Sequence, residues 1–118
     1  MSEPQKLVRP EGLSNAVGQV IAQNVAAGHN PNRFRQATAN GMSNELTQVI
    51  SALIANPTTG ALMATLIPSH PGLLTIEDYV IRWGLEWGFE PGVISLAAER
   101  VQWFDQIHGG ARYASDDD

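Results

Sequence analysis

The sequence has no cysteine, and charged residues make up only 16% of its 118 positions. The absence of cysteine excludes disulfide bonds, thiolate metal ligands and cysteine nucleophiles. The longest apolar-rich run, Gly60 to Ile67, is far shorter than the roughly 20 residues of a membrane-spanning helix. Residues 1–10 lack the apolar centre of a signal peptide. We therefore expect a cytoplasmic protein, or a component of a larger particle, that is not secreted by a signal peptide.

Sequence motifs for catalysis and nucleotide binding are also missing. There is no Gly-x-Ser-x-Gly, no P-loop and no Gly-x-Gly-x-x-Gly after a strand. The three histidines, His29, His70 and His108, stand far apart, whereas a zinc site on a helix needs a close pair. The terminal acidic run, 116–118, lacks the glycine and the distal glutamate of a calcium loop. These absences predict a protein with no catalytic residues, no metal site and no cofactor.

Two pairs of acidic residues are the remaining candidates for acid–base chemistry. Glu77 and Asp78 are adjacent at a predicted helix start, where capping and the helix dipole account for them. Glu99 and Asp105 are six positions apart, so they point to different sides of a helix. Both pairs are interpreted as solvated surface groups. The protein is accordingly predicted not to be an enzyme.

Apolar residues at helical spacing predict an all-α fold, a small bundle of about five short helices. The predicted helices start at or beside five positions: Leu13, Ser43, Thr59, Thr75 and Pro91. Thr75 and Asp78 form an approximate capping box for the fourth helix, which is expected to run to Gly88. Residues 28–41 hold turn dipeptides and one large apolar residue, so a long loop with at most one helical turn is expected there. No convincing strand is found.

Charge divides the chain into an arm and a body. Residues 1–40 have four basic and two acidic residues, 4 − 2 = +2, whereas residues 41–118 have three basic and ten acidic ones, 3 − 10 = −7. We divide the chain into an extended N-terminal arm (1–12), a single helical domain (13–110) and an acidic tail (111–118). The charge difference suggests that the arm docks on an acidic surface, such as the body of a neighbouring copy. Chance placement of surface charges is the alternative.

Arg33, Phe34 and Arg35 are the first candidate partner-binding residues, because they place an aromatic ring between two cations. That combination suits stacking on bases and pairing with phosphates, or binding to an acidic protein surface with Phe34 as an anchor. A loop with a packed phenylalanine is the alternative. Nucleic acid is disfavoured as the main partner by the acidic pI near 5.0.

An aromatic cluster supplies the second candidate surface. Six of the eight aromatic residues lie between Tyr79 and Phe104. Core packing is predicted for Trp83 and Phe104. The apolar faces that include Trp87 and Trp103 are wide for so small a domain, and we predict that these two side chains contact a partner.

These observations favour a non-enzymatic function in protein–protein interaction. The first hypothesis is a structural subunit of a larger assembly, for example a virion component, in which the N-terminal arm docks on a neighbouring subunit or copy. The second is a nucleic-acid-binding accessory module that uses Arg33, Phe34 and Arg35. The third is a small acidic inhibitor that blocks a partner enzyme with the carboxylates of residues 77–118.

Overall fold

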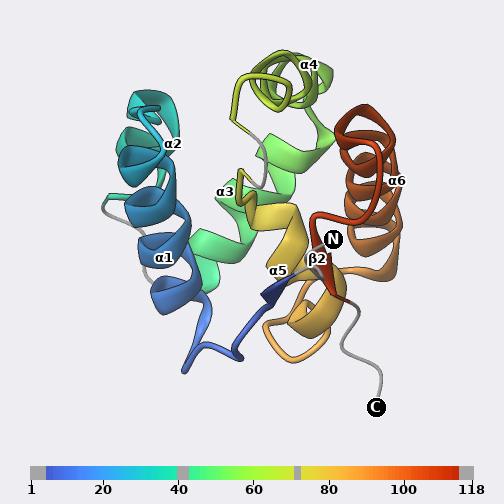
Figure 1. Cartoon of the computed structure of the whole chain (residues 1–118). Helices are drawn as coiled ribbons and strands as arrows, with labels where there is room; N and C mark the ends of the chain where they lie inside the picture. The colour runs from blue at the N-terminus through green and yellow to red at the C-terminus, as the bar shows by residue number, and fades with distance from the viewer. Residues whose placement is uncertain (1–4, 40–42, 71–72, 115–118) are drawn as a thin grey trace.

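The described part of the chain folds into six helices, one of which lies in the centre of the others (Figure 1). The computed structural model describes residues 5–39, 43–70 and 73–114. Its helices are α1 (Leu13–Ala26), α2 (Asn32–Thr38), α3 (Ser43–Ala55), α4 (Pro57–Leu66), α5 (Ile76–Trp83) and α6 (Pro91–His108). Two strands of two residues each, β1 (Gln5–Lys6) and β2 (Tyr113–Ala114), pair in parallel. The predicted all-α class is confirmed, with six helices where about five were expected.

The additional helix is α2, which occupies residues 32–38 of the segment expected to be a long loop. Phe34 is its one large apolar residue, and it packs against the core. A helix this short depends on tertiary packing and not on a repeating apolar stripe, because isolated short helices are unstable in water. Periodicity therefore indicated no more than a single turn here. Asn40 and Gly41, a predicted turn, lie outside the described residues.

The start of α5 has the predicted capping box. The Asp78 carboxylate accepts hydrogen bonds from the backbone N–H of Thr75 at 2.9 Å and from its hydroxyl at 3.0 Å. The helix ends at Trp83, five residues before the predicted Gly88, because a series of turns takes the chain from Gly84 to Gly88. Gly88 has φ +83°, a conformation that other residues rarely adopt. This tight corner brings α6 back along α5.

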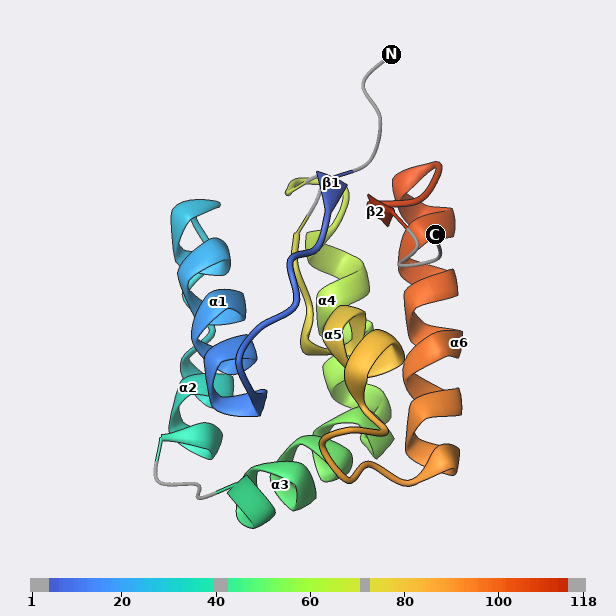
Figure 2. The same ribbon diagram turned by 90° about the horizontal axis from the view of Figure 1, so that it is seen from below.

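The segment from Leu73 to Val80 forms the centre of the molecule, and all eight of its residues are buried. Figure 2 shows α5 between α1 on one side and α6 on the other, with α3 across the end. The predicted burial of Trp83 and Phe104 is confirmed, at 6% and 0% exposure. Fully buried apolar side chains from the elements around this segment include Ala16, Ile50, Ile54, Ile67 and Ala97.

The helices α3 and α4 have one charged residue between them, Glu45. No single helix in residues 5–39, 43–70 or 73–114 is long and apolar enough to cross a membrane. The segment Glu45–Ala55 and α4 together satisfy the length and composition of a span, but they are bent by 74° at their junction. Ile50 and Ile54 of α3 point into the core instead.

The described part of the N-terminal arm lies on its own body. The strand β1 pairs with β2, so that Gln5 is opposite Tyr113 and Lys6 opposite Ala114. Leu7 packs against the core, Pro10 is buried, and Arg9 forms an exposed ion pair with Glu86. Residues 1–4 of the predicted arm lie outside the described residues.

The predicted acidic tail begins with packed residues. Arg112 is 4% exposed and Tyr113 is 9% exposed, and the Arg82 guanidinium donates to the carbonyl oxygen of Ala114 at 2.7 Å. Residues 112–114 therefore belong to the packed domain, whereas 115–118 lie outside the described residues. Sequence composition did not indicate this, because one arginine and one tyrosine beside three aspartates look like a polar terminus.

Burial of Tyr113 predicts a delayed tyrosine titration. Loss of solvation, and to a smaller extent the charge of Asp78, raise the pKa of Tyr113 to about 12. The unfolded chain loses this proton near pH 10, so the contribution of Tyr113 to stability is complete below that pH and is lost as the pH rises through about 12. Tyrosinate absorbance should therefore appear at higher pH in the native protein than in urea, and Tyr113→Phe should remove part of the difference. Equal titration curves in both conditions would contradict the burial of this ring.

Candidate functional site: a pocket beside two buried ion pairs

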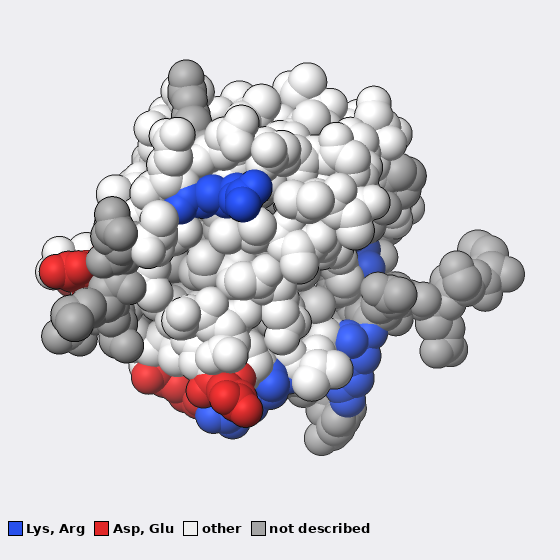
Figure 3. Space-filling view, turned by 90° about the vertical axis from the view of Figure 1, so that its left-hand side faces the viewer, with Lys and Arg blue, Asp and Glu red and all other residues white. Residues whose placement is uncertain are grey.

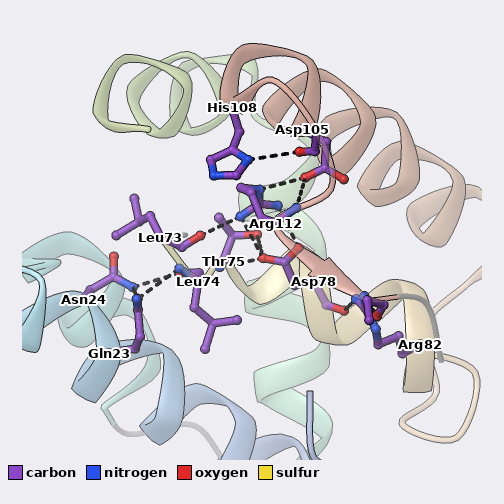
Figure 4. Close-up of polar contacts among 12 residues, drawn as sticks. Gln23, Asn24, Leu73, Leu74, Thr75, Asp78, Arg82, Asp105, His108 and Arg112 are labelled. Carbon is purple, nitrogen blue, oxygen red and sulfur yellow. Dashed lines mark hydrogen bonds and ion pairs between the residues drawn. The ribbon is translucent and has the colours of Figure 1, made fainter. Parts of the chain in front are cut away.

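Arg112 and Asp78 form a fully buried ion pair at the centre of the molecule (Figure 4). The two guanidinium nitrogens donate to the two carboxylate oxygens at 2.7 and 3.1 Å, and the side chains are 0% and 1% exposed. Arg112 also donates through Nε to Asp105 at 2.9 Å and through Nη1 to the carbonyl oxygen of Leu73. One arginine thus joins α5, α6 and the segment before α5.

Arg100 and Glu77 form a second buried pair. The Arg100 Nη1 atom is 3.0 Å from Glu77 Oε2 and 3.2 Å from both the Leu53 carbonyl oxygen and Thr59 Oγ1. The guanidinium crosses over Gly60, where an added Cβ would lie 3.0 Å from Arg100 Nε. Arg100 therefore ties the junction of α3 and α4 to α5, and a side chain at position 60 would crowd its guanidinium.

The prediction that Glu77 and Asp78 are solvated surface groups was wrong. Both are buried, at 4% and 1% exposure, because every residue from Ile76 to Val80 at the start of α5 is buried and two arginines neutralise the carboxylates. Burial raises the pKa of Glu77, and the hydrogen bond from Arg100 opposes that rise. Glu99 and Asp105 do lie apart, since Asp105 binds Arg112 and Glu99 is exposed. The ion pairs of Glu77, Asp78 and Asp105 hold elements together. Neither Glu77 and Asp78 nor Glu99 and Asp105 place two carboxylates in one cleft.

A pocket of about 300 Å³ lies between α1, α2, α3 and α4, beside the second ion pair. Apolar side chains make up most of its wall, and polar side chains lie around its exposed edge. Its lining residues include Val20, Phe34, Leu53, Ile54, Leu62, Met63, Ile76, Asn24, His29, Asn30, Asn32, Thr58, Thr59, Glu77 and Arg100. Ligand sites in proteins are characteristically apolar hollows with a few placed polar groups. This pocket is the described cavity that best matches that pattern.

The structure places Phe34 and Arg35 beside this pocket. Phe34 is half-buried and lines the wall, so its ring is not presented to solvent for stacking on a base. Arg35 is exposed and donates to Asn30 Oδ1 at 3.1 Å. The side chain of Arg33 lies outside the described residues.

The two tryptophans predicted to bind a partner lie in different places. Trp87 is half-buried beside Trp83, with ring centroids 6.4 Å apart, and its carbonyl oxygen accepts from the Thr47 hydroxyl of α3. Trp103 is 43% exposed on α6, where it lines a shallow hollow next to Pro57 of α4. The structure therefore leaves Trp103 accessible and packs most of Trp87 against the core.

A charge-poor face covers one side of the molecule. Residues 12–76 are 65 positions with three charged side chains, Arg33, Arg35 and Glu45, where average composition gives roughly 16. Figure 3 shows the side on which α1 and α2 lie, and its surface is almost free of charge apart from one basic side chain and the groups at its edges. Its exposed residues are Ser14, Asn15, Gly18, Gln19, Ala22, Val25 and Ala26 of α1 and Asn32, Arg35, Gln36 and Ala37 of α2.

Sequence reasoning missed Arg100, Arg112 and the pocket. A signal for the arginines is present: Arg82, Arg100 and Arg112 are the only basic residues after position 35, and none is a lysine. Arginine is the residue suited to buried pairs with several hydrogen bonds. The pocket had no such signal, because its lining comes from all six helices and the segments between them. Within the described ranges, no group of three His, Cys, Asp or Glu side chains is placed to hold a metal ion.

Comparisons with protein-family models, with curated proteins and with solved structures gave no significant match.

Proposed function

We propose that the chain is a non-enzymatic subunit of a larger assembly, such as a virion, and that its charge-poor face contacts a second copy of the chain. The observation that supports this most is that α1 has no charged residue and that α2 adds only Arg33 and Arg35 to this side of the molecule. Protein interfaces are depleted in charged residues at their centre, whereas ordinary surfaces are rich in them. Val25, 50% exposed in this face, supplies apolar area that a partner would cover.

Charge also favours a copy of the same chain as the partner. In a two-fold symmetric contact a patch meets itself, so a strongly charged patch would repel its own copy. Residues 77–118 have three basic and nine acidic residues, 3 − 9 = −6, whereas residues 12–76 have a net charge of 2 − 1 = +1. The side with little net charge is therefore the one on which two copies approach without repulsion.

The N-terminal arm enters this proposal as an exchangeable element. Its described contacts are a two-residue strand pair, the packing of Leu7 and Pro10, and the Arg9–Glu86 ion pair. A neighbour's arm could make the same contacts on this body, as happens when identical elements are exchanged between copies. In such an exchange the arm would dock on a neighbouring copy, as the difference in charge between the arm and the body leads us to expect.

The two alternative functions receive less support from the contacts. Nucleic-acid binding through Arg33, Phe34 and Arg35 would require the Phe34 ring to leave the pocket that it lines. Inhibition through acidic mimicry would lose Glu77 and Asp78, because both are buried in ion pairs. The assembly proposal requires no such rearrangement.

A pair of matched substitutions tests the charge-poor face. Val25→Lys places a cation in the face, at a helix end where the helix dipole tolerates it. Leu85→Lys makes the same chemical change at a residue that is 73% exposed in the turn after α5. We expect Val25→Lys to shift the protein to monomers in sedimentation experiments, because two copies of the cation would face each other, and Leu85→Lys to leave the mass unchanged. Equal masses for both variants, with unchanged helicity, would refute the assigned face.

A further inference from the structure

The interior of the pocket is apolar and has no net charge. Its one described carboxylate, Glu77, is paired with Arg100, and Asn24 donates to the carbonyl oxygens of Val20 and Leu74 at 2.8 Å. Among the described residues no buried side-chain nitrogen or oxygen lacks a hydrogen bond. The buried part of the wall therefore leaves no side-chain nitrogen or oxygen unsatisfied, and burial of apolar surface is the main interaction that it offers to a ligand.

The mouth of the pocket is polar and lies next to a cation. Asn30, Asn32 and Thr58 are the exposed polar residues of the lining, and they mark the opening between α2 and α4. Arg35 is bonded to Asn30 and is exposed to solvent. No described acidic residue lines the mouth, since Glu77 is on the inner wall. A negatively charged group at this opening would meet a guanidinium and amide donors, whereas a positive group would be repelled by Arg35.

The site therefore fits a ligand that has an apolar body, which lies inside the pocket, and an anionic head group, which lies at the opening. We propose that the pocket binds a medium-chain carboxylate, with the alkyl chain among Phe34, Ile54 and Met63 and the carboxylate beside Arg35. The volume of about 300 Å³ equals roughly ten water molecules at about 30 Å³ each, which suits a chain of about eight to ten carbons. This inference does not rest on the assembly proposal. Asn32 and Arg35 at the opening are also part of the charge-poor face, so a second copy bound there would cover the opening, and the binding measurements below are made at protein concentrations at which the chain is monomeric.

Three ligands of equal chain length separate the contribution of the head from that of the chain. Decanoate, decanol and decyltrimethylammonium are compared by their displacement of the apolar fluorophore N-phenyl-1-naphthylamine from the full-length protein. We expect decanoate to bind most tightly, decanol less tightly and the ammonium compound least. Equal affinities for decanoate and the ammonium compound would overturn the assigned head group. Failure of all three, and of the fluorophore, to bind would overturn the pocket itself.

A matched pair on α4 tests where the chain binds. Met63 lines the pocket and is half-buried, so Met63→Trp would fill the space that the alkyl chain needs. Thr65 is exposed on the same helix and does not line the pocket, so Thr65→Trp adds the same side chain elsewhere. Losing burial of two methylene groups costs about tenfold in affinity, and we expect at least that loss for decanoate with Met63→Trp only. Equal affinity in both variants would place the ligand outside this pocket.

Arg35→Gln tests the head group without touching the core. Arg35 is exposed, so folding should be unaffected, and circular dichroism checks this. Loss of an exposed ion pair corresponds to about two- to fivefold in affinity. We expect decanoate affinity to fall by that factor and decanol affinity to stay constant. A parallel fall for both ligands, or for neither, would overturn the role of Arg35.

Discussion

Asp78→Ala should destabilise the protein more than any single change to a surface charge. The substitution leaves the Arg112 guanidinium buried, with the side chain 0% exposed, and removes the partner at 2.7 Å. It also removes the acceptor for the Thr75 backbone N–H at the start of α5. Breaking a buried pair by removing one partner costs about 3–5 kcal/mol. Urea denaturation followed by circular dichroism measures this loss in unfolding free energy.

Two further variants isolate the effect of the buried charge. Arg9→Ala breaks the exposed pair with Glu86, and exposed pairs contribute about 0–1 kcal/mol. The double variant Asp78→Leu, Arg112→Met removes both buried charges, so it should be more stable than Asp78→Ala alone. A loss for Asp78→Ala as small as that for Arg9→Ala would show that the central pair is not buried as described.

The second large effect is expected for Phe104, the fully buried aromatic residue in the C-terminal half of α6. Its side chain is 0% exposed, and the Arg112 guanidinium carbon lies 5.5 Å from the ring centroid. Phe104→Ala removes this packing and leaves a cavity under the buried arginine, and such changes cost about 3–5 kcal/mol. The same denaturation measurement gives the loss.

The neighbouring tryptophan provides the matched control for Phe104. Trp103 stacks on Phe104 with ring centroids 5.9 Å apart, but it is 43% exposed. Trp103→Ala removes less buried area and leaves no enclosed cavity, so it should cost much less than Phe104→Ala. Similar losses in unfolding free energy for the two variants would contradict the difference in burial between Phe104 and Trp103.

Local sequence signals were enough to predict the helices that have a repeating pattern or a specific cap. The capping box of Thr75 and Asp78 is observed, whereas α4 begins at Pro57 after its cap Asn56, two residues before the expected Thr59. The helix α2 lacked such a pattern, because Phe34 is its one large apolar residue. Its stability comes from packing against distant parts of the chain, which a local window does not contain.

The candidate site was less predictable than the fold, because its contacts are made between residues far apart in the sequence. Glu77 meets Arg100 across 23 positions, and Asp78 meets Arg112 across 34. From sequence, each carboxylate at a helix start has a sufficient local explanation in capping and the helix dipole. Only the central position of α5, whose first five residues are all buried, requires that both carboxylates be neutralised by arginines.

The solution mass of the full chain, measured by light scattering over a range of protein concentrations at low and high salt, tests the assembly proposal most directly. A contact through a charge-poor face is little affected by salt, because ions screen charges and not apolar contacts. We expect species heavier than the 12.7 kDa chain that persist at high salt. A mass of 12.7 kDa at every concentration and both salts would contradict it.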